Sequence, residues 1–578
     1  MRSCRSPLGC RTATDRSKDR VSCEPFALFL LASRCAIATG TPKGQVGCRL
    51  WHVTEAIDTT LVGKWVGGFE IPGGWRFIQL DVELGSKGHL EAHADVLFES
   101  DARLRNLAGA DGRLSFELAR GNETLRFEGE RQAEVIAGAV SSKVWQGTAI
   151  LLRAHALSDP RPYRGTYRFS DEHFVAVFAL EGFYIPGSLA MVEVPSGEIR
   201  FLFATAGGSL VTGPGFFVPQ PTEREFEFSD AQSGGFQRVR MRGPGGKDSE
   251  GHRLKLREEE LHFSNGDVTL VGTLVLPPGD GPHPAIVIAH GSGDAVRDDP
   301  FAHLLARRGF AFFRYDKRGV GASGGDWHTA SFDDLADDVV AALRCLATRP
   351  DIDSKRMGIW GWSQGGWIAP LAATRTEDVA FLVLQVPPAV SPEEQEIDRV
   401  ENELRVDGFP QSEINQAAEF MRRKAAYART GTDWSEFKAY LKRSAESAWF
   451  PYAGSPMEKD SWAWTFFRLI NDYDPVPVLE RIRCPVLALF GEMDRNILPG
   501  INAPILEAAL RRAGNRRVTV KVFPHANHGL FECRSGGPKE LPLVRRYVPG
   551  YLPTLFDWLE RVAFTGVVDP DRRDSAAR

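Results

Sequence analysis

The sequence predicts a β-rich N-terminal region with a sandwich- or barrel-like fold, followed by a mostly parallel sheet with helices on both faces and a helical cap. In short segments between about residues 61 and 257, apolar and polar residues alternate, as in half-buried strands. From residue 254 onwards, apolar strand-like runs alternate with helical stretches, which is typical of a parallel sheet between helices. A polar and aromatic segment at 391–481 interrupts this second pattern.

Composition limits the classes of protein and partner. The chain has 578 residues, which is long enough for roughly two to four domains. Its 43% hydrophobic and 25% charged residues are typical of a folded globular protein. The formal net charge is −5 and no basic stripe is present, so we expect no nucleic-acid partner. No segment outside the leader approaches the roughly 20 apolar residues of a membrane span. The oligomeric state cannot be read from the sequence.

Residues 1–50 form a leader with two open interpretations. Basic residues precede the apolar run 26–32, and Ala36-Ile37-Ala38 resembles a signal-peptidase site, but Arg34 interrupts the end of the run. If the leader is a signal peptide, the protein is periplasmic or secreted; if the leader is disordered, the protein is cytoplasmic. Five of the eight cysteines lie in this leader, and none shows the Cys-x-x-Cys spacing of metal or redox sites.

The β-rich region is predicted at 51–257. Residues 78–84 alternate between apolar and polar side chains, as one buried sheet face requires, and similar alternation is expected at 114–118 and at 174–180. Turn signals separate the short strands, which suggests a sandwich or barrel. The spacing is also consistent with two units that meet near residue 159.

The catalytic domain is predicted at 258–565, and residues 566–578 are expected to be a disordered tail. Residues 331–346 predict a helix, because Ser331 can cap it and acidic residues fill its first turn. The candidate strands are 285–289, 311–313, 356–360, 381–386, 486–490 and 518–523. The segment 391–481 predicts an inserted helical cap over the carboxyl ends of these strands, where open α/β sheets bind ligands. The alternative is a peripheral helical decoration.

The most informative motif is Gly361-Trp362-Ser363-Gln364-Gly365, which lies between a strand and a small-residue helix. A serine between two glycines on such a turn can be held as an exposed nucleophile. It needs a base to accept its proton and a carboxylate to orient that base. The sequence therefore predicts an acid and a histidine downstream of Ser363.

Asp494 and His528 are the predicted acid and base. Asp494 follows the strand 486–490, and His528 follows the strand 518–523, so both lie at the carboxyl edge of the sheet with Ser363. Glu492 is the alternative acid, and strand register favours Asp494. His525 is the alternative base, and the Asn527-His528-Gly529 context favours His528.

The backbone N–H groups of Ser292 and Gln364 are the predicted donors of an oxyanion hole. Gln364 directly follows the nucleophile, and Ser292 lies in the small-residue loop after the strand 285–289. We expect His290 to pack beneath that loop. Asp316 and Arg318 are expected to brace a neighbouring loop by ion pairing, with contact to a substrate carboxylate as the alternative.

These motifs together resemble the α/β-hydrolase superfamily, above all bacterial serine hydrolases related to serine aminopeptidases, dienelactone hydrolases and the C-terminal domains of acyl-CoA thioesterases. The resemblance covers about residues 258–562, and its motifs are 290–293, 316–321, 361–365, 491–494 and 527–529. It implies a triad of Ser363, Asp494 and His528, an oxyanion hole at Ser292 and Gln364, and a cap between the last strands. Related proteins often carry a β-rich N-terminal region and an export signal.

Three functions are consistent with these residues. The first is a serine hydrolase that cleaves a carboxylic ester through an acyl-enzyme, and the aromatic cap favours an apolar acyl or aromatic group. The second is an aminopeptidase or acyl-CoA thioesterase with the same triad; Glu393, Glu394 and Glu396 are weak candidates for holding a substrate amine. The third is a non-catalytic binding protein with a vestigial site. No metal or organic cofactor is needed, and the expected substrate is a small ester, peptide or acyl compound.

Overall fold

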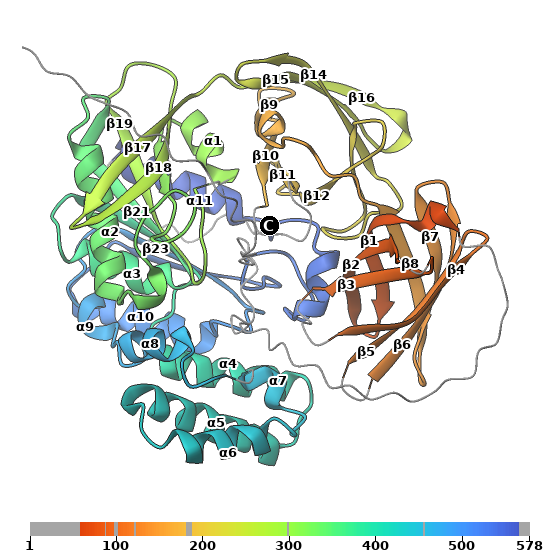
Figure 1. Cartoon of the computed structure of the whole chain (residues 1–578). Coiled ribbons are helices and arrows are strands. Elements are labelled where there is room, and N and C mark those ends of the chain that lie inside the picture. The colour runs from red at the N-terminus through yellow and green to blue at the C-terminus, as the bar shows by residue number, and fades with distance from the viewer. Residues whose placement is uncertain are drawn as a thin grey trace, which may run out of the picture.

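The computed structural model describes residues 58–565, except for 87, 98–101, 121–122, 181–187, 298–299 and 455–456. The predictions for the leader and for the tail at 566–578 lie outside these residues. The strands form three units, which are two eight-stranded sheets and, between them in the sequence, a closed barrel (Figure 1). Among the described helices, none combines the length and the apolar character needed to cross a bilayer.

The first unit is an antiparallel sheet with the strand order β3-β2-β1-β8-β7-β6-β5-β4. Ile78, Leu80 and Val82 are buried in its core, together with Trp65. Its strands are β1 (Gly63–Ile71), β2 (Gly74–Leu84), β3 (Leu90–Val96), β4 (Arg103–Ala110), β5 (Arg113–Arg120), β6 (Glu123–Gln132), β7 (Val135–Ser141) and β8 (Gln146–Arg153).

The second unit is a closed antiparallel barrel in which β16 pairs with β9. Its strands are β9 (Gly165–Arg168), β10 (Phe174–Ala179), β11 (Leu189–Val194), β12 (Ile199–Ala204), β13 (Leu210–Thr212), β14 (Arg224–Gln232), β15 (Gly235–Arg242) and β16 (Asp248–Arg253). The alternation predicted at 174–180 is wrong, because every residue of β10 is buried. Val175 and Val177 belong to the barrel core, whereas Phe174 and Phe178 pack in a cluster shared with the third unit.

The third unit is an eight-stranded sheet with the order β17-β18-β20-β19-β21-β22-β23-β24. The pairs β17–β18 and β18–β20 are antiparallel, and all later pairs are parallel. Its strands are β17 (Arg257–Asn265), β18 (Val268–Leu276), β19 (His283–Ala289), β20 (Ala311–Tyr315), β21 (Ile352–Trp362), β22 (Val379–Gln385), β23 (Val486–Gly491) and β24 (Val518–Phe523). The predicted mostly parallel sheet is confirmed.

Helices cover both faces of this sheet. On one face lie α1 (Pro300–Arg307) and α11 (Tyr551–Glu560). The other face carries α2 (Phe332–Ala347), α3 (Gly365–Ala373) and α10 (Pro499–Arg512). The side chain of Ser331 caps α2 in a reciprocal capping box with Asp334, as the sequence pattern indicates.

The segment between β22 and β23 folds into helices that extend from the sheet domain (Figure 1). They are α4 (Pro392–Val406), α5 (Gln411–Thr430), α6 (Trp434–Ser444), α7 (Phe450–Ala453), α8 (Trp462–Ile470) and α9 (Val476–Leu479). We call this segment the cap. Its helices have a hydrophobic cluster of their own, which includes Val400, Phe420 and Tyr427.

The barrel is joined to the third unit by backbone hydrogen bonds as well as by packing. The amides of Ile199 and Phe216 donate to the carbonyl oxygens of Arg545 and Val544 at 2.9 and 2.8 Å. The amide of Tyr547 donates to the carbonyl oxygen of Gly197 at 2.9 Å. The chain between β24 and α11 therefore runs along the barrel before it returns to the sheet domain.

Candidate active site

A tight turn holds Ser363 between β21 and α3. Ser363 has a φ of 52°, a backbone conformation that is unfavourable for a residue with a side chain. A Cβ on Gly361 would lie 2.2 Å from the carbonyl oxygen of Gly365, and a Cβ on Gly365 would lie 2.1 Å from that of Ala289. Both flanking positions therefore require glycine, which explains the Gly-x-Ser-x-Gly pattern.

A continuous hydrogen-bonded chain connects Ser363, His528 and Asp494. The Nε2 atom of His528 lies 3.1 Å from Oγ of Ser363, and its Nδ1 atom lies 2.8 Å from Oδ2 of Asp494. Oδ1 of Asp494 accepts hydrogen bonds from the backbone N–H groups of Asn496 and Ile497, at 2.8 and 2.9 Å. Both oxygens of the Asp494 carboxylate are thus hydrogen-bonded. The side chains of Ser363, His528 and Asp494 are all buried.

The two alternative residues lie outside this chain of hydrogen bonds. Glu492 accepts a hydrogen bond from the backbone N–H of His525 at 3.0 Å. His525 itself is exposed and has a φ of 55°. The structure therefore brings Asp494, rather than Glu492, to the imidazole of His528, and brings His528, rather than His525, to Ser363.

The backbone amides of Ser292 and Gln364 have the properties expected of oxyanion donors. Ser292 lies in the loop after β19, and Gln364 lies at the start of α3. Within the described part of the chain, neither amide donates a hydrogen bond, whereas the amide of Ser363 donates to the carbonyl oxygen of Gln385 at 2.9 Å. The amides of Ser292 and Gln364 are therefore available as donors to a substrate oxygen.

A protein-family model described as serine aminopeptidase, S33, matches residues 280–532. This range includes all the residues of the candidate site and most of the parallel sheet. The C-terminal domain has the α/β-hydrolase fold and is similar in sequence to this family.

Individual relatives are distant from this hydrolase domain in sequence. Esterase EstD of Thermotoga maritima is 24% identical over 293 residues, which are 49% of this chain and 63% of that protein. The uncharacterized peptidase YuxL of Bacillus subtilis is 23% identical over 56% of this chain and 42% of its own length. The chain thus spans less than two thirds of these relatives. A solved esterase of Pyrococcus furiosus aligns with 53% of this chain and 89% of its own, at 16% identity and a TM-score of 0.34.

Lys317 ties together the two loops that carry the candidate oxyanion amides. Its side chain is 2% exposed, and Nζ donates to the carbonyl oxygens of Gly291 and Gly293, on either side of Ser292, at 3.0 and 3.2 Å. It also donates to Oε1 of Gln364 at 3.0 Å. The ammonium group lies 4.8 Å from the ring centroid of Trp327. Lys317 is therefore a positioning residue for both loops.

The same burial predicts a pH-dependent stability. Desolvation lowers the pKa of Lys317 from 10.5 to about 7. Between these two values the unfolded chain binds more protons than the folded chain, so the free energy of unfolding gains a contribution that rises with pH. Below about pH 7 this contribution is at its minimum.

We expect the stability difference between the wild type and Lys317→Met to move in favour of the wild type between pH 7 and pH 9. Urea unfolding of both proteins at the two pH values measures this difference. A difference that does not change with pH would mean that Lys317 has an ordinary pKa in the folded protein. Lys355→Met, on an exposed part of β21, is the matched control and should show no such trend.

The other charged residues of this region stabilise loops. Asp316 accepts hydrogen bonds from the backbone N–H groups of Arg297 and Ala322 at 2.9 Å each. Arg318 forms a buried ion pair with Asp338 at 2.6 Å. Asp316 and Arg318 thus brace the structure through separate partners, in agreement with the bracing role expected from the sequence.

His290 is buried beneath the Ser292 loop and packs edge-on against Tyr315, with a centroid distance of 4.7 Å. Desolvation and the nearby cations hold the pKa of His290 well below its usual value, so the ring is neutral. In the described part of the chain, no group of three or more His, Cys, Asp or Glu side chains is arranged to hold a metal ion.

The three cap acids considered for binding a substrate amine have partners within the cap. The carboxylate of Glu394 forms a capping box with Ser391 at the start of α4. Glu393 forms an ion pair with Arg429, and Glu396 pairs with Arg399 at 2.9 Å. The structure therefore gives each of these acids a stabilising role in the cap.

The cap contacts the candidate site through α4, and two of its tryptophans belong to the cap's own core. Gln395 of α4 donates to the side-chain and backbone oxygens of Asn496, at 2.9 and 3.0 Å. Nδ2 of Asn496 in turn lies 3.4 Å from Nε2 of His528. Trp449 and Trp464 are buried in the cap's own hydrophobic cluster, and neither lines the apolar pocket described below.

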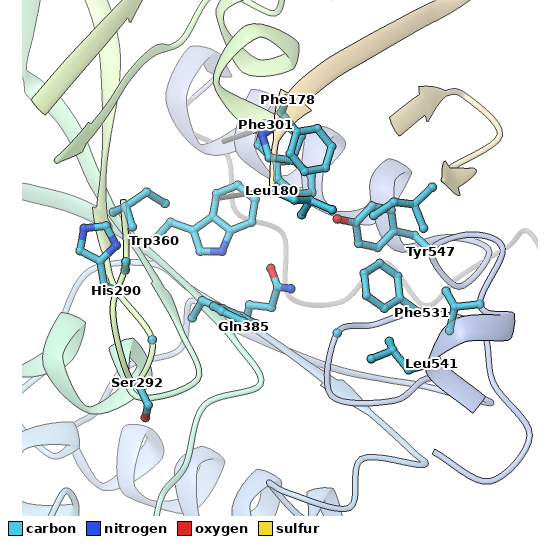
Figure 2. Close-up of a pocket in the computed structure, with 18 of the residues that line it drawn as sticks. Phe178, Leu180, His290, Ser292, Phe301, Trp360, Gln385, Phe531, Leu541 and Tyr547 are labelled. Atoms are coloured by element: carbon cyan, nitrogen blue, oxygen red, sulfur yellow. The ribbon is translucent and has the colours of Figure 1, made fainter. Parts of the chain in front are cut away.

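A large apolar pocket begins at the Ser292 loop and extends to the barrel (Figure 2). It contains about 1100 Å³ of space, including the part open to solvent. The hydrolase domain contributes aromatic and aliphatic side chains, and so do barrel residues that are distant in sequence. The barrel residues are Phe178, Leu180, Ile199 and Phe216, and the main residues of the hydrolase domain are Ile288, Phe301, Trp360, Trp362, Phe531, Leu541, Val544 and Tyr547.

Neither the role of Lys317 nor the barrel wall was predicted from the sequence. Lys317 lies inside the motif 316–321, but nothing in a lysine's sequence neighbours indicates that its ammonium group is buried. The wall had a usable signal: residues 174–180 contain no polar side chain, and a strand that is apolar throughout has both faces buried.

Proposed function

We propose that this protein is a serine hydrolase that cleaves carboxylic esters through an acyl-enzyme intermediate. The observation that carries the proposal is the chain of hydrogen bonds from Ser363 Oγ through the imidazole of His528 to Asp494, with distances of 3.1 and 2.8 Å. A serine hydroxyl becomes a nucleophile when a base that is oriented by a carboxylate accepts its proton.

In the proposed reaction, Oγ of Ser363 attacks the ester carbonyl carbon while Nε2 of His528 takes the hydroxyl proton. Asp494 stabilises the resulting imidazolium. The amides of Ser292 and Gln364 donate to the oxyanion of the tetrahedral intermediate. His528 then gives the proton to the departing alcohol, and a water molecule, activated by the same imidazole, releases the acid and restores Ser363. Side chains and backbone amides supply every step.

Cleavage of amides and thioesters uses the same catalytic groups as cleavage of esters. The surroundings of the triad must therefore decide which of the three bonds is cleaved. The cap acids Glu393, Glu394 and Glu396 have partners of their own, which disfavours the recognition of a substrate amine by these residues. An apolar pocket suits the uncharged acyl group of a carboxylic ester. An aminopeptidase or a thioesterase remains the second candidate, because similarity extends to both an esterase and a peptidase.

Labelling with a fluorophosphonate probe tests whether the site is catalytic. We expect the wild type to be labelled and Ser363→Ala to remain unlabelled, because the probe reacts with an activated serine. Ser331→Ala, which removes a helix-capping hydroxyl outside the proposed catalytic chain of hydrogen bonds, is the control and should be labelled. An unlabelled wild type would favour a binding protein with a vestigial site, and equal labelling of Ser363→Ala would refute the assignment of the nucleophile.

Comparison of three substrate classes tests the type of bond. We expect p-nitrophenyl esters to be cleaved with a higher kcat/KM than aminoacyl anilides or acyl-CoA thioesters. A faster reaction with the anilides would identify an aminopeptidase, and a faster reaction with the acyl-CoA compounds would identify a thioesterase.

A further inference from the structure

The apolar pocket adjoins the proposed catalytic residues. Trp362, which precedes Ser363, and Gly529, which follows His528, both line it. Gln385, whose carbonyl oxygen accepts the Ser363 amide, lines it as well. In Figure 2, Ser292 lies at one edge, with Phe178 and Leu180 across the space from it. A group bound in this pocket would therefore be next to the reacting carbonyl.

The proposed chemistry assigns directions around Ser363. The alcohol must leave within hydrogen-bond reach of Nε2 of His528, which protonates it. Among the described residues, Nε2 of His528 also has Asn496 as a polar neighbour, and Asn496 is held by Gln395 of the cap. The carbonyl oxygen must face the amides of Ser292 and Gln364. The side of Ser363 that faces the cap is thus assigned to the alcohol of the ester. The side that faces the barrel is left for the acyl group.

The pocket is built to hold an apolar group. Its polar members are few, and two of them have partners. Asp294 accepts a hydrogen bond from Trp327 Nε1 at 2.7 Å, and Oε1 of Gln385 accepts one from the hydroxyl of Tyr551 at 2.9 Å. His290 is kept neutral by its burial. A charged or strongly polar acyl group would lose most of its hydration for few new partners, whereas an apolar group gains free energy from burial.

We propose that the substrate's acyl group is a long apolar chain that lies between the hydrolase domain and the barrel, with Phe178, Leu180, Ile199 and Phe216 as its outer wall. This inference rests on the proposed esterase function. It gives the barrel a role in substrate selection. The wall is fixed in place, because the amides of Ile199 and Phe216 donate to the chain segment 544–545, which follows His528.

A series of p-nitrophenyl esters from acetate to decanoate tests the proposal with the full chain. We expect kcat/KM to rise about fourfold for each added methylene until the chain fills the pocket. A second series, of acetate esters with alcohols of graded length, should show no comparable rise. A rise in the alcohol series alone would place the alcohol in the pocket and overturn the proposal.

Two variants change the barrel wall in opposite directions. Leu180→Trp fills the pocket and should lower the decanoate-to-acetate ratio of kcat/KM by at least about tenfold. Phe178→Ala enlarges the pocket and should move the preferred ester to a longer acyl chain. Leu84→Trp, the same change at an exposed position of the first sheet, should leave the ratio as in the wild type. Thermal unfolding verifies that each variant is folded.

Decanoate binding to Ser363→Ala separates this inference from the proposed function, because it does not require turnover. Calorimetry should detect decanoate binding that is weakened at least about tenfold when Leu180→Trp is added. Equal binding with and without Leu180→Trp, or an unchanged ester ratio in a protein that labels at Ser363, would overturn the inference alone. Absence of both labelling and ester hydrolysis would contradict the proposed function, while the binding measurement would still decide whether the pocket takes an acyl chain.

Discussion

Replacement of His528 by alanine is expected to lower kcat for p-nitrophenyl esters by about 10⁴- to 10⁶-fold. His528 is the group that contacts both Ser363, at 3.1 Å, and Asp494, at 2.8 Å. Without the imidazole, the proton of the serine hydroxyl has no acceptor and the departing alcohol has no donor. Single-turnover and steady-state kinetics at saturating substrate measure this loss.

The double variant Ser363→Ala/His528→Ala should retain about the same residual kcat as either single variant. Residues that act as one unit are not additive, because loss of the nucleophile already removes the step that the base assists. Multiplicative losses in the double variant would contradict a shared step. Both single variants should keep the KM close to the wild-type value, since the pocket is unchanged.

His525→Asn is the matched control for His528→Ala. His525 lies three residues away, is exposed, and has a φ of 55°, which asparagine tolerates better than most residues. We expect the kcat of His525→Asn to stay within about twofold of the wild type, because the His525 ring takes no part in the hydrogen bonds that join Ser363, His528 and Asp494. A large loss of kcat in His525→Asn, together with an active His528→Ala, would mean that His525 is the base instead of His528.

The candidate triad could be predicted from the sequence because each member follows a strand of the same sheet. Ser363 comes directly after β21, Asp494 shortly after β23, and His528 shortly after β24. Parallel strands bring their carboxyl ends to one edge of the sheet. Local patterns of apolar residues, which are visible in the sequence, are therefore sufficient to place them together. The glycines at 361 and 365 added a second local signal.

The pocket wall could be predicted only in part. The apolar run 174–180 indicates a strand with both faces buried, but what packs on its outer face depends on contacts between distant segments. Phe178 and Ile199 lie 114 and 93 residues before Ser292, and no local pattern indicates which domain packs on the outer face of the barrel. The cap shows the opposite problem. Its many tryptophans suggested a substrate pocket, but Trp449 and Trp464 are buried in the hydrophobic core of the cap itself.

Replacement of Asp494 by asparagine is expected to lower kcat by about 10⁴-fold with little change in fold. The side-chain oxygen of asparagine can still accept the hydrogen bonds that Asn496 and Ile497 donate to Oδ1. The amide nitrogen, however, would replace Oδ2 and donate to Nδ1 of His528. The imidazole would then carry its proton on Nε2 and could not accept the proton of Ser363.

Glu492→Gln is the control that matches Asp494→Asn in chemistry. Glutamine keeps an oxygen that can accept the backbone N–H of His525, the contact that Glu492 makes at 3.0 Å, so kcat should stay within about twofold of the wild type. Urea unfolding should show similar stability for both amide variants. If Glu492→Gln is inactive and Asp494→Asn keeps more than about a tenth of the wild-type kcat, the acid is Glu492. The loss expected for Asp494→Asn comes from the wrong tautomer of the imidazole and not from unfolding. If both variants keep their activity, neither carboxylate sets this tautomer, and His528 works without a carboxylate.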